Sequence, residues 1–166
     1  SFTGSRYTSD ANDHKEAINI DTPDKNTGGF NQIWTNYDRT PNDNIIIRDN
    51  KFTDVLRAIG THKYSVSPLD GTTQLYHTNI QILNNTITNT HSYAIRSINW
   101  KDCVIKGNTI KNVNNGDTVA ILMSGTVNPT TTENTIDPAL RPLALNTTSN
   151  TDSSLPDKAY PATHTI

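Results

Sequence analysis

The chain has 166 residues and a formal net charge of −2, which is enough for one domain with a hydrophobic core. It offers no basic surface for nucleic acid and no apolar stretch of about 18 residues for direct membrane insertion. Thr (26) and Asn (21) make up 47 residues, and Ile (17) outnumbers Leu (9), so we expect strands and turns with almost no helix.

The first expected strand lies in DHKEAINID (13–21), where charged residues flank a short apolar centre that contains Ala17-Ile18. A long polar segment, 22–43, follows it and is expected to be a loop. Ala-Ile pairs return at Ala58-Ile59, Ala94-Ile95 and Ala120-Ile121. This recurrence indicates that the first strand belongs to a repeating unit.

A second recurring pattern is Asn, any residue, then Ile or Phe, beginning at Asn50, Asn85, Asn108 and Asn134. The intervals are 35, 23 and 26 residues (85−50, 108−85, 134−108), and the longest contains a second expected loop, 62–78. Each repeat is interpreted as a strand, an Asn turn, a short strand, a polar turn and a strand. Repeats of this kind without helical crossovers predict an all-β, right-handed parallel β-helix (a β-solenoid) with about 4–5 coils stacked ~4.8 Å apart.

Stacked coils place equivalent residues of successive repeats above one another. The four asparagines are therefore expected to form a buried hydrogen-bonded ladder at turns that require the αL conformation, which Asn tolerates. The same stacking predicts aliphatic columns in the core: Ile47/Ile82/Ile105, Phe52/Ile87/Ile110/Ile136 and Ile18/Ile59/Ile95/Ile121. The single Cys103 is expected to be a small buried residue.

The C-terminal region after Asn146 loses the strand pattern and is rich in Thr, Ser and Pro. We expect a solenoid domain at 1–146 and a tail or linker at 147–166. Because Ser1 is not an initiator methionine, we expect a mature or excised piece, and from the composition of the tail we expect it to be part of a larger multi-module protein.

Candidate functional residues follow from the alternation of strand side chains. With Ile18, Ile59 and Ile95 inward, residues one and three positions later point outward. Stacking then predicts Asp21 beside His62, and Asn19 near Arg96 on either side of Gly60. Gly60 is expected to leave a bare place where a ligand approaches the backbone.

The same offset places Glu16 opposite Arg57. Charged groups of both signs on one sheet suit polysaccharide chemistry, either binding or cleavage. The candidate substrate-binding residues are His14, Glu16, Asn19, Arg57, Lys63 and Arg96.

If the protein is an enzyme, the catalytic candidates are His62, Asp21 and Lys15. Lyase chemistry needs a base that removes the proton α to a uronate carboxylate and a cation that neutralises the carboxylate. Hydrolysis needs two carboxyls about 5–10 Å apart, for which Glu16 and Asp21 are available. The structural alternative is a solvated face whose Asp21–His62 pair contributes about 1 kcal/mol or less. The pattern predicts no metal site and no cofactor.

Four segments carry a family resemblance: DHKEAINID (13–21), IGTH (59–62), YHTNIQILNNTI (76–87) and YAIRSIN (93–99). Together they resemble bacterial right-handed parallel β-helix repeat proteins, related in fold to pectate lyases and found in secreted and cell-wall proteins of Gram-positive bacteria. The resemblance spans roughly residues 10–140 and implies a solenoid that binds or acts on extracellular polysaccharide. The residues that it points to are His14, Lys15, Glu16, Asp21, His62 and Arg96.

Surface adhesins of lactobacilli are similar in using such a solenoid to hold glycans. The leading hypothesis is therefore a module of an extracellular, cell-surface or cell-wall protein, with polysaccharide or host glycans as partners. Two alternatives remain: the C-terminal part of a polysaccharide-degrading enzyme, a uronate lyase before a glycoside hydrolase, and a purely structural spacer.

Overall fold

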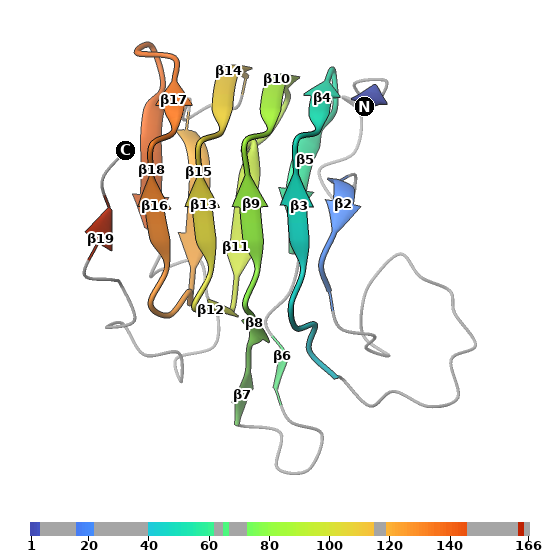
Figure 1. Cartoon of the computed structure of the whole chain (residues 1–166), viewed down its shortest axis with the longest axis vertical. Helices are drawn as coiled ribbons and strands as arrows, with labels where there is room; N and C mark the ends of the chain where they lie inside the picture. Colours follow the sequence, from blue (N-terminus) through green and yellow to red (C-terminus); the bar gives the residue numbers. More distant parts are fainter. Residues whose placement is uncertain are drawn as a thin grey trace.

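The structure, a computed structural model, describes residues 1–3, 16–21, 40–61, 65–66, 73–114, 119–145 and 163–164. Every regular element in these ranges is a β-strand, as expected for a chain rich in Thr, Ile and Asn. Three five-stranded parallel sheets dominate the molecule, and their strands repeat side by side along its length (Figure 1). The architecture is therefore all-β, with stacked parallel sheets of the kind found in β-solenoids.

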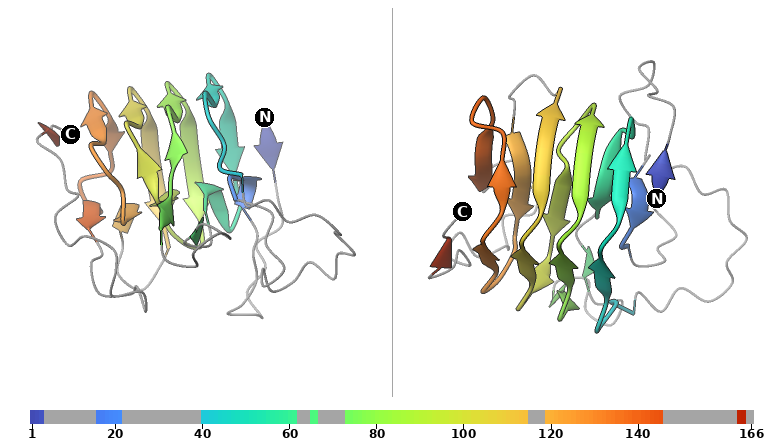
Figure 2. Two further views of the ribbon diagram at one scale, coloured as in Figure 1. Left: turned by 90° about the horizontal axis from the view of Figure 1, so that it is seen from below. Right: turned by 45° about the horizontal axis from the view of Figure 1, so that its top comes forward.

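The strands are arranged so that each successive repeat adds one strand to each large sheet (Figure 2). The first sheet contains, in order, β1 (Phe2–Thr3), β4 (Lys51–Thr53), β10 (Thr86–Thr90), β14 (Thr109–Val113) and β17 (Thr135–Ile136). The second contains β18 (Arg141–Leu145), β15 (Val119–Ser124), β11 (Ile95–Ile98), β5 (Arg57–Gly60) and β2 (Glu16–Asn19). The third contains β19 (Thr163–His164), β16 (Thr130–Thr132), β13 (Val104–Lys106), β9 (Gln81–Leu83) and β3 (Ile46–Arg48).

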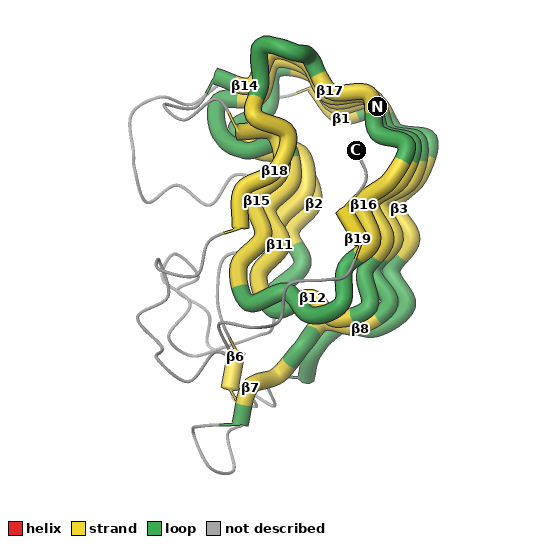
Figure 3. Tube along the Cα trace, turned by 90° about the vertical axis from the view of Figure 1, so that its left-hand side faces the viewer, coloured by secondary structure: helices red, strands yellow, loops and turns green. Residues whose placement is uncertain are grey.

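The core lies between the three sheets, which Figure 3 shows in a view along the stack. All three expected columns are confirmed by strand register, because each residue pairs with the next one in its column. The columns are Ile47–Ile82–Ile105, Phe52–Ile87–Ile110–Ile136 and Ile18–Ile59–Ile95–Ile121. At the N-terminal end, Phe2 continues the Phe52 column, with ring centroids 4.8 Å apart. Burial of these apolar side chains provides the main driving force for stacking.

Most turns between strands use residues in the αL conformation that recur at five-residue intervals. The members of this series are Asn44, Asp49 and Asp54, then Asn79, Asn84 and Asn89, then Asp102, Gly107 and Asn112, then Asn128 and Glu133. Asn99 and Gly125 also have positive φ but lie outside the series. The expectation that the Asn50-type residues take αL is therefore wrong, because the residue before each of them does. At Gly107, where φ is 68°, an added Cβ would approach Asn84 Oδ1 so closely that this exposed side chain would have to move.

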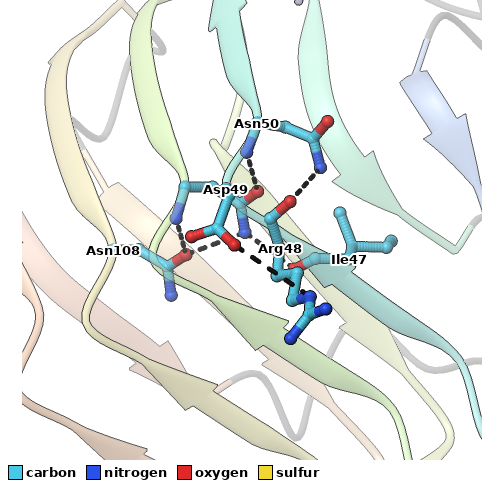
Figure 4. Close-up of polar contacts among 6 residues, drawn as sticks. Ile47, Arg48, Asp49, Asn50 and Asn108 are labelled. Carbon is cyan, nitrogen blue, oxygen red and sulfur yellow. Dashed lines mark hydrogen bonds and ion pairs between the residues drawn. The ribbon is translucent and has the colours of Figure 1, made fainter.

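The asparagines that follow these turns are joined by hydrogen bonds (Figure 4). The backbone N–H groups of Asn50, Asn85 and Asn108 donate to the side-chain Oδ1 of the next asparagine along the stack at 3.0, 2.9 and 3.0 Å. The Nδ2 groups of Asn85, Asn108 and Asn134 donate to the carbonyls of Ile47, Ile82 and Ile105, each at 2.9 Å. Asn108 is completely buried, and these bonds satisfy its amide.

Two segments expected to be irregular contain strands. Within 62–78, β6 (Ser65–Val66) and β7 (Gln74–Leu75) pair antiparallel, while β8 (His77–Thr78) pairs parallel with β12 (Trp100–Lys101). In the C-terminal region, β19 extends the third sheet by pairing with β16.

Candidate functional site

The outward face of the second sheet carries the residues predicted to form a site. Asn19 pairs in register with Gly60, and Gly60 with Arg96, so the expected row across three strands is confirmed. Asn19 is exposed and Arg96 is half-buried. The row continues to Leu122 on β15, which is 5% exposed and packs in a small cluster with Val119 and Tyr93. The face therefore changes from polar to apolar along the stack.

Glu16 and Arg57 form the expected contact, and it is an ion pair. Arg57 Nη1 donates directly to Glu16 Oε1. The Glu16 side chain has no exposed surface and the Arg57 side chain is 11% exposed. The guanidinium also contacts the hydroxyl of Ser92, at 3.3 Å from Nη2. Their burial does not support direct contact with a large ligand, so we assign both residues a structural role.

Gly60 is not the bare place that the sequence suggested. It is buried, and a Cβ built on it would lie 3.1 Å from Cγ of Glu16 and 3.3 Å from Cδ of Arg57. The side chains of the ion pair occupy the space above the glycine. The absence of a side chain at Gly60 therefore makes room for a charged pair from β2 and β5 and leaves no access to the backbone.

Asp21 lies just after β2, where the structure brings it near Asn42 and His77. The Asn42 Nδ2 donates to the Asp21 carbonyl at 3.0 Å, and the Asn42 backbone N–H donates to Nδ1 of His77 at 3.0 Å. The pairing of Asp21 with His62 stays a prediction, because His62 lies outside the described residues. The other candidates outside the described residues are His14, Lys15 and Lys63.

His77 is buried and electrically neutral at ordinary pH. Burial lowers the pKa of His77 from 6.5 to about 4, although the nearby Asp21 carboxylate acts in the opposite direction. The hydrogen bonds that Nδ1 accepts fix the tautomer with the proton on Nε2. The sequence analysis gave His77 no role.

A second buried polar chain lies next to His77, because β8 pairs His77 with Trp100. The Trp100 indole N–H donates to the Thr61 hydroxyl at 2.7 Å, and this hydroxyl donates to the Ile20 carbonyl at 2.7 Å. Trp100 and Thr61 are completely buried. Sequence reasoning missed the pairing of His77 with Trp100, although the signal was present: 100−77 equals the 23-residue step between Asn85 and Asn108.

The remaining chemistry of the described residues is limited. Burial raises the pKa of the Cys103 thiol to about 12, and this residue is confirmed as a buried core cysteine. Among the described residues, no three or more His, Cys, Asp and Glu side chains gather in a way that suits a metal ion. Within the same ranges, no helix has the length and apolarity needed to cross a membrane.

Comparisons with family models, curated proteins and solved structures found no match to this chain. Its function is therefore inferred from the geometry of the molecule itself.

Proposed function

We propose that this chain is a glycan-binding module of a bacterial surface protein, an adhesin fragment that binds extracellular or host polysaccharide. In this proposal it is a right-handed parallel β-helix of about 4–5 coils with an asparagine ladder, related to pectate-lyase-like solenoids of Gram-positive cell surfaces. The stacked parallel sheets support the solenoid, since they repeat polar positions at the ~4.8 Å spacing of adjacent strands. An extended partner such as a polysaccharide suits such a repeating surface.

The burial of Glu16 is the observation that favours glycan binding over hydrolytic cleavage. Hydrolysis on this sheet would use Glu16 and Asp21 as its carboxyl pair. The Glu16 side chain has no exposed surface and its carboxylate is neutralised by Arg57, so it is unsuited to donate a proton to a substrate. Asn19, which is exposed, and Arg96, which is half-buried, carry an amide and a guanidinium, and both groups are of the kind that donates hydrogen bonds to sugar hydroxyls.

A lyase is the alternative within the same substrate class, with Lys15 and His62 as the candidate groups that the sequence suggests. The test incubates the protein with uronate-containing polysaccharides and follows the ultraviolet absorbance of unsaturated chain ends. Binding alone predicts retention on a glycan array with no absorbance change. Turnover that is abolished by His62→Ala would contradict the binding proposal.

The contribution of the Asn19–Arg96 row is tested with the variant Asn19→Ala/Arg96→Gln. We expect weaker retention on the array with a far-ultraviolet spectrum unchanged. Arg48→Gln is the matched control, because Arg48 is an exposed arginine on the third sheet, with a side chain 71% exposed. If neither variant changes retention, the row is not the contact surface; if the unaltered protein retains no glycan, the module is a spacer.

A further inference from the structure

The segment 40–44, called the strap below, precedes β3 and is held against β8 at a corner of the stack (Figure 3). The N–H of Asn44 donates to the Thr78 carbonyl at 3.2 Å, and the N–H of Thr78 donates to the Asn42 carbonyl at 3.0 Å. The Asp43 carboxylate accepts from the side-chain amide of Asn79 at 2.9 Å. The strap is therefore joined to β8 by hydrogen bonds.

The strap has no buried side chain that would fix it to the core. Thr40, Asp43 and Asn44 are exposed, and Pro41 and Asn42 are half-buried. Segments with few buried apolar contacts and solvent-exposed hydrogen bonds open locally at a low free-energy cost. The strap is therefore expected to open without unfolding of the sheets.

The buried side chain at this contact belongs to His77 of β8, which is 1% exposed. Its Nδ1 accepts from the Asn42 backbone N–H at 3.0 Å and lies 3.1 Å from Asn42 Nδ2, which also donates to the Asp21 carbonyl at 3.0 Å. A protonated imidazole carries an N–H on both nitrogens and accepts no hydrogen bond. A proton on Nδ1 would therefore face two donors of Asn42 and remove both contacts.

The charged and titratable groups near His77 come from several described elements. The Asp21 carboxylate, after β2, favours the protonated ring, whereas burial disfavours it and lowers the pKa of His77 from 6.5 to about 4. The strap contributes Asp43, and β12 contributes the exposed Lys101. Hydrogen bonds from neighbouring side chains lower the pKa of Asp43 below 3.8, and burial raises that of Tyr76 above 10. Asp43 and Tyr76 therefore keep their charge states while His77 titrates.

We propose that the strap is an acid-sensitive device: one proton on His77 releases it from β8 while the stacked sheets stay folded. The release also frees the Asp21 carbonyl from Asn42 at the end of β2. Strand β2 itself stays attached, since the Ile20 N–H donates to the Gly60 carbonyl at 2.8 Å independently of the strap. The device does not depend on the glycan-binding function proposed above.

The direction and size of the acid effect follow from proton binding. In the open strap His77 is accessible and has its ordinary pKa of 6.5, against about 4 in the closed strap. The open form binds the proton more readily, so the strap is closed above about pH 6.5 and loosens as the pH falls towards 4. The ratio of open to closed forms should rise about tenfold per pH unit, to a limit of roughly 300-fold.

Amide hydrogen exchange, corrected for the intrinsic effect of pH, measures this ratio. The amides of Asn42, Asn44 and Thr78 report on the strap, and the Val104 amide, which donates to the Ile80 carbonyl at 2.8 Å, is the reference within the stack. Between pH 7 and pH 4 we expect protection of the strap amides to fall by up to roughly 300-fold. The reference amide should stay clearly better protected, with an unchanged far-ultraviolet circular dichroism spectrum.

Two variants assign the effect to His77 and to the strap. His77→Asn keeps an acceptor for the Asn42 N–H without a titrating group, so its strap should stay protected in acid; the matched control His91→Asn should respond as the unaltered protein does. Asp43→Cys/Thr78→Cys places cysteines at bridge partners. Its oxidised form should keep the strap closed at pH 4, whereas its reduced form should release it.

Three results would overturn the proposal. One is constant protection of the strap amides in the unaltered protein from pH 7 to pH 4. Another is an equal loss of protection in His77→Asn. The third is a fall of the Val104 amide to the protection of the strap amides, because acid would then unfold the whole stack and not the strap alone.

Discussion

Glu16 and Arg57 form a buried ion pair directly above Gly60, between two strands that are 41 residues apart in the sequence. The pair closes the part of the second sheet where the sequence suggested an open contact for a ligand. Strands β2 and β5 therefore depend on each other, because each supplies the charge that neutralises a buried charge of the other.

Removing one partner of this pair should destabilise the protein strongly. Glu16→Ala removes the carboxylate that neutralises the buried Arg57 guanidinium, and we expect a loss of about 3–5 kcal/mol in the free energy of unfolding. Glu16→Leu/Arg57→Met, which replaces both charges by apolar groups, should recover most of this loss. Urea denaturation measures both, and a Glu16→Ala loss below about 1 kcal/mol would show that water reaches the pair in solution.

Gly60→Ala should destabilise because the added methyl group meets side chains that are held in place. The Cβ would lie 3.1 Å from Glu16 Cγ and 3.2 Å from Glu16 Oε1, and the ion pair keeps these atoms from moving away. We expect a cost of about 1–3 kcal/mol in the free energy of unfolding. The same substitution in the Glu16→Ala background should cost clearly less, because the obstructing side chain is gone; equal costs in a double-mutant cycle would exclude this explanation.

Asn108→Ala should destabilise through the backbone groups that it leaves unpaired. Its side chain accepts from the Asn85 N–H at 2.9 Å and donates to the Ile82 carbonyl at 2.9 Å, both in the buried interior. We expect a loss of about 2–4 kcal/mol in the free energy of unfolding, since two buried polar groups lose their partners. Thermal unfolding followed by circular dichroism measures the effect.

Asn50→Ala is the control for this prediction. The Asn50 side chain is half-buried and donates to the nearby Arg48 carbonyl at 2.9 Å, an exposed bond whose loss should cost at most about 1 kcal/mol. Equal losses for the two variants would mean that burial does not determine the contribution of these asparagines.

Acid should destabilise the protein in a pH window set by His77. Burial lowers the pKa of His77 from 6.5 to about 4, so the unfolded chain binds a proton more readily than the folded one. Stability from this group is therefore fully present above about pH 6.5 and falls as the pH falls towards 4, by roughly 3 kcal/mol in all. Denaturation curves across this range measure the slope.

His77→Asn separates this effect from other titrating groups. The asparagine Oδ1 is placed to accept the Asn42 N–H in the position of Nδ1, yet it carries no titrating group. The stability difference between pH 7 and pH 4 should shrink accordingly. An unchanged pH dependence would assign the acid sensitivity to other residues.

The sequence by itself was sufficient to predict stacked parallel strands, the three aliphatic columns and the Asn19–Gly60–Arg96 row. These features depend on side-chain alternation and on a repeat step, both of which are local and can be counted along the chain. The Glu16–Arg57 contact followed from the same step. The strands in the expected loop at 62–78 were not predicted, because pairs as short as Ser65–Val66 have too few residues to show alternation.

Only the tertiary structure decided which of these residues are accessible. Burial depends on side chains that arrive from other repeats, as at Gly60, where neighbours from β2 and β5 fill the space that the sequence suggested was open. The contact of Asn42 with both Asp21 and His77 likewise arises from segments that only the stacked sheets bring together. A repeat pattern predicts which residues are aligned, whereas the packing around them determines whether a ligand can reach them.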